Sequence, residues 1–261
     1  MQFTLPDKSV SKIPVNQAEI KEVNGKNYYV FTCEVVAKDM ASKVKAQLVL
    51  SDGSKCTEYI YSVRDYAEYF IESETASTYN DYYYRCNLIK SMLTYGTYSQ
   101  KYFNYNTDNL ANTKYYYSIP EITANTVNSY KFTTDGTAEG FEYVGSSLSL
   151  KSETAIKHYF KLDNGVDVNT LDFKIDGTSV TPVKSGEYYY IKISNIAAQD
   201  IDKFYTVTVN DFTLKYSALS YVYAALSLTE EGNENLHNLC KSLYSYNSEA
   251  DDYLYYITNN S

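Results

Sequence analysis

The segment Asn87–Tyr105, NLIKSMLTYGTYSQKYFNY, decides the fold because a related segment, Asn238–Tyr256, NLCKSLYSYNSEADDYLYY, occurs later in the chain. Apolar residues recur in both segments at spacings of three and four, which is typical of one buried face of an α-helix. The identical positions are Asn87, Leu88, Lys90, Ser91, Tyr95, Tyr102 and Tyr105, which match Asn238, Leu239, Lys241, Ser242, Tyr246, Tyr253 and Tyr256. The sequence therefore predicts two long helices that belong to two copies of one structural unit.

The regions before each long helix also correspond. Runs rich in β-branched and aromatic residues come first, and a short helical pattern opens at Tyr61-Ser62 in one region and at Tyr216-Ser217 in the other. We expect strands within about 1–60 and 130–215, short helices at about 63–72 and 218–227, and long helices at about 79–104 and 235–256. The predicted division is a first repeat over 1–110, a linker over 111–125 and a second repeat over 126–261. Ser and Thr of the segment ESETAST are candidate N-caps of the first long helix.

These patterns predict an α+β fold made of two tandem copies, each an antiparallel, sandwich-like β-sheet followed by a helical hairpin. The two copies differ in length, because residues 141–162 contain alternating strand patterns that have no equivalent in the first copy. The first copy is therefore expected to lack its N-terminal strands and to have fewer strands than the second. This difference suggests a piece cut from a longer protein.

Bulk composition narrows the classes of partner. The net charge is -9, and Lys and Arg form no basic run, which argues against nucleic acid and against an anionic membrane surface. The apolar runs are too short to span a bilayer, and the first residues show no signal-peptide pattern. The four cysteines share no motif spacing; Cys240 is expected to be a small buried hydrophobe, and free thiols are favoured over a Cys33–Cys56 bond.

No catalytic or metal-binding constellation is evident. His158 and His237 are the only histidines, and neither has a metal-ligand spacing, so each is expected to be a surface or capped residue. Nucleophile motifs and glycine-rich phosphate loops are absent from the sequence, and its glycines are interpreted as turn positions. We therefore expect a protein that is not an enzyme, with no catalytic residue, no metal and no cofactor.

Tyrosine is the unusual feature, with 32 copies and no tryptophan. Its ring, its hydroxyl and its two side-chain torsions suit contact surfaces. Consecutive tyrosines cannot all face one core, so two clusters become candidate binding residues: Tyr79, Tyr82, Tyr83, Tyr84, Tyr115, Tyr116 and Tyr117. The alternative is a tyrosine-rich core between sheet and helices.

Four segments carry a resemblance to a known module. They are YSVRDYAEYF from Tyr61, LIKSMLTYGTYSQKYFNYNTDNLAN from Leu88, YTVTVNDFTLKYSALSYVYAAL from Tyr205 and NLCKSLYSYNSEADDYL from Asn238. Together they resemble a module that recurs in large secreted and cell-surface proteins of gut Firmicutes of the Lachnospiraceae and Ruminococcaceae type. The resemblance implies an extracellular, cell-surface location but no catalytic residues and no single ligand.

The sequence thus predicts a non-catalytic binding module. Exposed tyrosines would bind a protein partner; the resemblance adds host immunoglobulin or another secreted glycoprotein as candidates. One alternative is a carbohydrate-binding module for starch or another glycan, which the absence of tryptophan disfavours. The other is a structural spacer without an exposed aromatic cluster.

Overall fold

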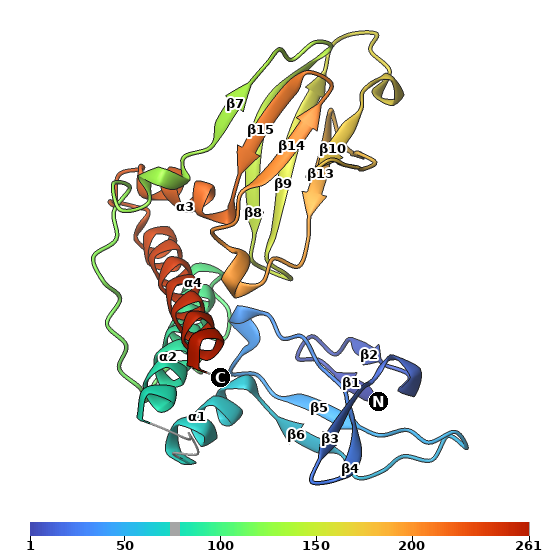
Figure 1. The fold of residues 1–261 in the computed structure, drawn as a ribbon, viewed down its shortest axis with the longest axis vertical. Coiled ribbons are helices and arrows are strands. Elements are labelled where there is room, and N and C mark those ends of the chain that lie inside the picture. The colour runs from blue at the N-terminus through green and yellow to red at the C-terminus, as the bar shows by residue number, and fades with distance from the viewer. Residues whose placement is uncertain (74–78, 261) are drawn as a thin grey trace.

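The fold is α+β, as the sequence predicts, and the computed structural model describes residues 1–73 and 79–260. Two β regions lie at opposite ends of the molecule, and two long helices lie between them (Figure 1). The helices are α1 (Val63–Ser73), α2 (Tyr79–Tyr102), α3 (Ala218–Leu226) and α4 (Glu234–Asn260). Each begins within one residue of its expected start.

The first unit, defined by β1–β6, α1 and α2, contains two separate sheets. One is four-stranded in the order β2-β1-β5-β6, and the other is the hairpin β3-β4. The strands are β1 (Gln2–Thr4), β2 (Val10–Lys12), β3 (Glu19–Val23), β4 (Lys26–Val30), β5 (Val44–Gln47) and β6 (Tyr59–Tyr61). The hairpin turn is Asn24-Gly25, both with positive φ, as a two-residue type I′ turn requires.

The second unit, defined by β7–β15, α3 and α4, is a sandwich of two antiparallel sheets. The strand orders are β11-β10-β14-β15-β7 and β12-β13-β9-β8. The strands are β7 (Thr133–Asp135), β8 (Phe141–Ser149), β9 (Ala155–Leu162), β10 (Phe173–Ile175), β11 (Thr178–Ser179), β12 (Val183–Ser185), β13 (Tyr188–Ile193), β14 (Tyr205–Val209) and β15 (Phe212–Tyr216). Edge-to-face contacts of Phe160 with Phe173 and of Phe141 with Phe212, at centroid distances of 5.4 and 5.7 Å, fill the space between the sheets.

The pairing order of the first unit repeats that of the second, strand for strand. The order β2-β1-β5-β6 corresponds to β11-β10-β14-β15, and β3-β4 corresponds to β12-β13. Within the described residues, the first unit has six strands and the second has nine, so the first unit has fewer strands, as expected; the three without a counterpart are β7, β8 and β9. That the two units are copies of one another stays a prediction, but they share this pairing order.

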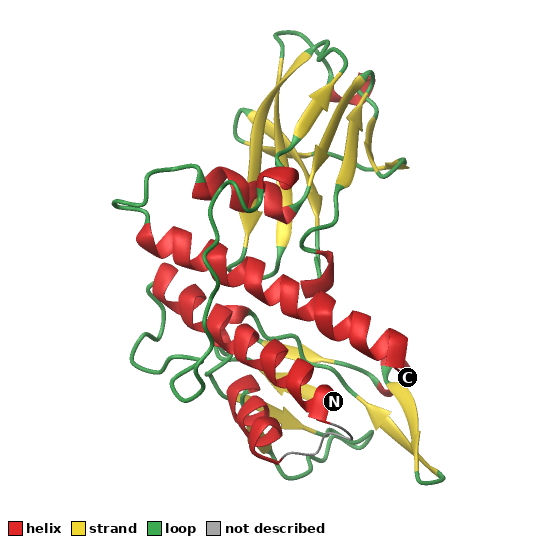
Figure 2. Ribbon diagram, turned by 60° about the vertical axis from the view of Figure 1, so that its left-hand side comes forward, coloured by secondary structure: helices red, strands yellow, loops and turns green. Residues whose placement is uncertain are grey.

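The two long helices pack on each other more closely than on their own hairpin partners. They lie side by side and run antiparallel (Figure 2). Their apolar faces meet at Tyr95 and Tyr246, the same position of the repeated segment. These two rings stack at a centroid distance of 5.8 Å, and Tyr84 stacks on Tyr256 at 4.8 Å. The repeated stripe is therefore core, but the core joins the two units instead of closing each one separately.

A close approach inside this helix layer depends on Gly96. A β-carbon at Gly96 would lie 2.9 Å from Met40 Sδ and from Ala111 Cβ, and 3.1 Å from the Ala37 carbonyl oxygen. The interpretation of every glycine as a turn position was wrong here, because Gly96 lies within α2. The matching residue of α4, Asn247, instead donates a 2.9 Å hydrogen bond to the Ala198 carbonyl.

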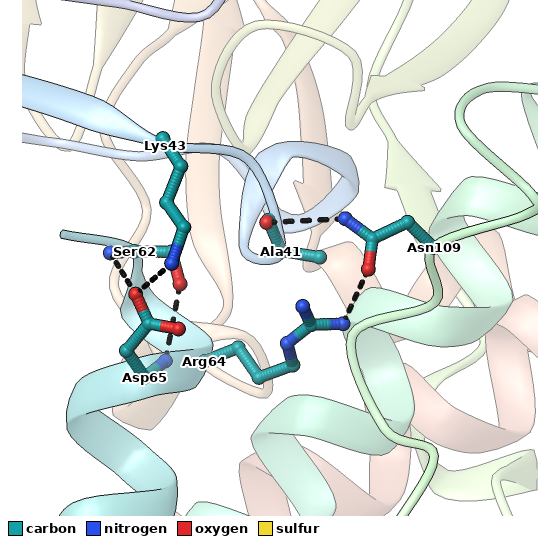
Figure 3. A network of polar contacts seen from close by, with 6 residues as sticks. All are labelled: Ala41, Lys43, Ser62, Arg64, Asp65 and Asn109. Atoms are coloured by element: carbon teal, nitrogen blue, oxygen red, sulfur yellow. Dashed lines mark hydrogen bonds and ion pairs between the residues drawn. The ribbon is translucent and has the colours of Figure 1, made fainter. Parts of the chain in front are cut away.

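The N-terminus of α1 is capped by its own residues and bonded to neighbouring loops (Figure 3). Ser62 Oγ accepts from the Asp65 N–H at 3.1 Å, and Asp65 Oδ2 accepts from the Ser62 N–H at 2.9 Å, which forms a reciprocal capping box. Arg64 donates to the Asn109 side chain at 2.7 Å, and thereby fixes the start of the inter-unit segment to α1. Of the N-caps expected for α2, Ser73 is the last residue of α1, and the others lie outside the described residues.

Candidate functional site

The segment that joins the two units crosses the outside of α4 and α2 (Figure 2). Residues 103–127 contain neither helix nor strand. Gln100, fully buried on α2, fixes the start of this segment: its amide accepts from the Ala111 N–H at 2.7 Å and donates to the carbonyl oxygens of Asn106 and Asn109 at 3.2 and 2.9 Å. The predicted tyrosines Tyr115, Tyr116 and Tyr117 follow a few residues later.

Two of these three tyrosines are anchored to the helices. Tyr115 donates its hydroxyl hydrogen to Glu72 Oε1 at the end of α1, at 2.8 Å, and Lys114 forms an ion pair with the same carboxylate. Tyr117 donates to Glu249 Oε1 on α4 at 2.9 Å. Burial raises the pKa of Tyr117 above its usual range, and the hydrogen bond to Glu249 adds to this shift. Both hydroxyls therefore stay protonated and donate at neutral pH.

The middle tyrosine has the opposite orientation. Tyr116 is 85% exposed, whereas the hydroxyls of its two neighbours are bonded to α1 and α4. Its ring lies at the rim of a groove of about 410 Å³ between the segment, α2 and α4. The groove is lined by Asn87, Lys90, Tyr116, Tyr117, Ser118, Pro120, Tyr244, Ser245, Ser248 and Glu249.

Glu249 is the charged group of the groove whose pKa is shifted by burial. Burial raises the pKa of its carboxyl, and the hydroxyl of Tyr117 opposes this shift by donating to the charged form. Asp251, one position beyond Ala250 on the same helix, has its pKa raised to about 6 by burial and by Asp202, Asp252 and Asp200. Glu249 is therefore the acidic group that lines the groove on α4, whereas Lys90 on α2 supplies a positive charge on the opposite wall.

The tyrosines predicted on α2 divide into structural and exposed residues. Tyr82 donates to the Ile71 carbonyl at 2.9 Å and fixes α1 to α2, next to the Glu72 carboxylate that holds Tyr115. Tyr84 stacks on Tyr256 and belongs to the helix interface. Tyr83 is 50% exposed. The side chain of Tyr79 lies outside the described part of the molecule.

The structure thus brings the two predicted clusters to the same region, around the first half of α2. Among the described candidates, Tyr83 and Tyr116 have rings that are at least half exposed, whereas the others make the internal contacts above. The groove residues from α4 were missed from the sequence. The sequence feature that could have indicated them is the match of Asn87 and Lys90 to Asn238 and Lys241. This match shows that the two helices have related faces, but it does not show that these faces meet.

Both histidines are buried, so the expectation of surface or capped positions was wrong. His158 on β9 is fully buried, and its Nδ1 lies 2.5 Å from Ser146 Oγ, which lies 2.6 Å from the Tyr143 hydroxyl. Burial lowers the pKa of His158 to about 3. A serine and a histidine in contact suggest a nucleophile, but so weak a base inside a sandwich core cannot accept the serine proton at neutral pH. The pair is a structural contact between strands.

Among the described residues, the cysteines form no disulfide and the acidic side chains form no metal-binding group. All four cysteines are free, and Cys240 is buried, with a pKa that burial raises to about 12. Among residues 1–73 and 79–260, no group of three or more His, Cys, Asp or Glu side chains is arranged to hold a metal ion. No described helix is both long and apolar enough to cross a membrane.

Comparison of the chain with family models, with curated proteins and with solved structures found no match.

Proposed function

We propose that this protein is a non-catalytic binding module, and that the groove beside Tyr116 contacts a protein partner. The observation that carries the proposal is the fixed exposure of Tyr116. Its neighbours are held by hydroxyl–carboxylate bonds to α1 and α4, so an 85% exposed ring is presented without a large loss of entropy on binding. Rigid, exposed tyrosines dominate many protein interfaces.

The surroundings of Tyr116 supply the other parts of an interface. The groove wall offers Asn87 and Lys90 as hydrogen-bond donors, and Glu249 with three serines as acceptors. Immunoglobulin or another host glycoprotein enters as a candidate partner only through the family resemblance. The proposed cell-surface location has the same basis.

A glycan is a second candidate, because the groove combines aromatic rings with amide, ammonium, hydroxyl and carboxylate groups. A cavity of about 410 Å³ lies within the size range of small-ligand sites. A protein partner would need a contact surface of about 800 Å² per side, well beyond the groove itself. A spacer without binding activity is the remaining alternative.

Binding assays with a matched tyrosine control test the proposal. Immobilised protein would be titrated with polyclonal immunoglobulin and, separately, with soluble starch. Tyr116→Ala should weaken the observed binding about 10- to 30-fold, the range of an interface hot spot. Tyr69→Ala removes a ring that is 68% exposed on α1 and does not line the groove, so it should bind like the unmodified protein.

The outcomes separate the candidates. Binding of immunoglobulin but not starch supports the protein partner, and the reverse pattern supports the glycan. Equal binding by Tyr116→Ala and Tyr69→Ala would exclude the groove as the contact surface. Failure of both ligands would favour the spacer.

A further inference from the structure

The first unit has two separate β-sheets with much exposed apolar surface, where the second unit has a closed sandwich. In the second unit β13 pairs on one side with β12 and on the other with β9, and β8 continues the sheet. In the first unit β4 pairs only with β3 within the described residues, so the edge that corresponds to the β9 side of β13 is open. This open edge is independent of the groove beside Tyr116.

Exposure differs accordingly between the two units. Tyr28 and Tyr29 on β4 are 51% and 61% exposed, whereas Ile191 on β13 is 2% exposed. Every residue of β3 is exposed. Further large apolar side chains at the surface of the first unit are Val10, Val15, Ile20, Val23, Leu48, Leu50, Tyr59 and Ile60. An isolated hairpin with this much exposed apolar surface is marginally stable in water.

The main hydrophobic cluster shows what the first unit lacks. It runs through the second sandwich and the helix layer, but none of its members lies on β1–β6. Ile156, His158 and Phe160, at alternate positions of β9, are all buried, and Phe141 comes from β8. The hairpin β8–β9 therefore contributes much of the apolar filling that the first unit has no equivalent for.

We propose that the open edge of β4 is a docking site for a β-hairpin of a partner polypeptide. The inner strand of that hairpin pairs antiparallel with β4, as β9 pairs with β13. Its apolar residues at alternate positions cover the β2-β1-β5-β6 sheet. The occupant is thus defined by its chemistry: two strands of alternating apolar and polar residues, with backbone hydrogen bonds giving affinity and side chains giving specificity.

The backbone groups of β4 are suitably oriented for this pairing. Val23 and Lys26 flank the two-residue turn, so they form a hydrogen-bonded pair, and such pairs alternate with non-bonded pairs along the hairpin. The pair Ile20 and Tyr29 is therefore non-bonded, and its backbone groups point away from the hairpin. The Tyr29 N–H faces the open edge of β4, and the Ile20 N–H faces the opposite edge of β3.

Amide hydrogen exchange on the full chain tests the proposal. The probe is a synthetic peptide with the sequence Phe141–Leu162, which is the strand pair that fills the corresponding place in the second unit; a scrambled peptide of the same composition is the control. The peptide should slow the exchange of the 26–30 amides at least tenfold at saturation, and the scrambled peptide should not. Absence of protection at millimolar peptide would overturn the proposal.

Two proline variants identify the edge. Tyr29→Pro removes the N–H that faces the incoming strand and should abolish protection, whereas Ile20→Pro removes its counterpart on the other edge and should leave it intact. Both residues are more than half exposed, and an unchanged helical circular dichroism signal would show that each variant folds. Equal protection in both variants would refute pairing at β4. Protection that needs no peptide, rises with protein concentration and accompanies a dimer mass would assign the edge to a second copy and overturn the hairpin partner.

Discussion

Acidification should destabilise this protein through His158. Its imidazole is fully buried, so folding lowers its pKa from 6.5 to about 3. The folded state holds the neutral ring, and between these two pKa values only the unfolded state binds the proton. The contribution of His158 is therefore fully present above about pH 6.5 and is lost progressively as the pH falls toward 3.

The magnitude follows from linkage. At pH 5 the unfolded ring lies about 1.5 pH units below its pKa of 6.5 and the folded ring remains neutral. The free energy of unfolding should thus be about 2 kcal/mol lower at pH 5 than at pH 7.5 from this residue alone. Asp251, whose pKa is raised to about 6, acts in the opposite direction because its neutral form is favoured in the folded state. It is a more solvated group, so its effect is smaller.

Urea unfolding at pH 7.5 and pH 5, for the unmodified protein and for His158→Gln, isolates the contribution. The variant should be less stable at both pH values, but its loss between them should be about 2 kcal/mol smaller. Should the variant not fold, the His158 ring resonances of the unmodified protein provide the test by nuclear magnetic resonance. They should not titrate down to about pH 4.5. A midpoint near 6.5, or identical pH dependence in both proteins, would refute the reasoning.

Two further predictions concern the helix layer. Gly96→Ala should lower the free energy of unfolding by about 1–3 kcal/mol, because its β-carbon would overlap Met40 and Ala111; chemical denaturation measures this, and an unchanged midpoint would contradict the close approach. Gln100→Leu should cost about 1–3 kcal/mol for each buried backbone group left unpaired, and hydrogen exchange should show the Ala111 amide losing protection, since the Gln100 side chain is its acceptor. Protection of the Ala111 amide equal to that of the unmodified protein would show that another acceptor replaces Gln100.

The helices were predictable from the sequence, whereas their partners were not. Spacings of three and four placed Tyr95 and Tyr246 on buried faces because one face of a helix repeats with that period. Periodicity shows that a face is buried but not what covers it. Hence the packing of α2 on α4, and the role of Gly96 in bringing α2 against Met40, appeared only in the structure.

The candidate site was predictable in part. Three consecutive tyrosines had to include exposed rings, and Tyr116 is one. The sequence could not show that Tyr115 and Tyr117 find Glu72 and Glu249, since those carboxylates lie on elements far away in the chain. The full burial of His158 was not predicted, because a neutral, hydrogen-bonded imidazole is tolerated in a core, and composition does not reveal that state.

The difference between Gly96 and Asn247 has a consequence for assembly of the chain. The two long helices have similar sequences, so each could in principle occupy the position of the other, within one molecule or between two molecules. An asparagine at the α2 position would collide with Met40 and Ala111, and a glycine at the α4 position would leave the Ala198 carbonyl without its donor. The missing β-carbon at Gly96 and the side-chain amide of Asn247 thus prevent either helix from taking the place of the other.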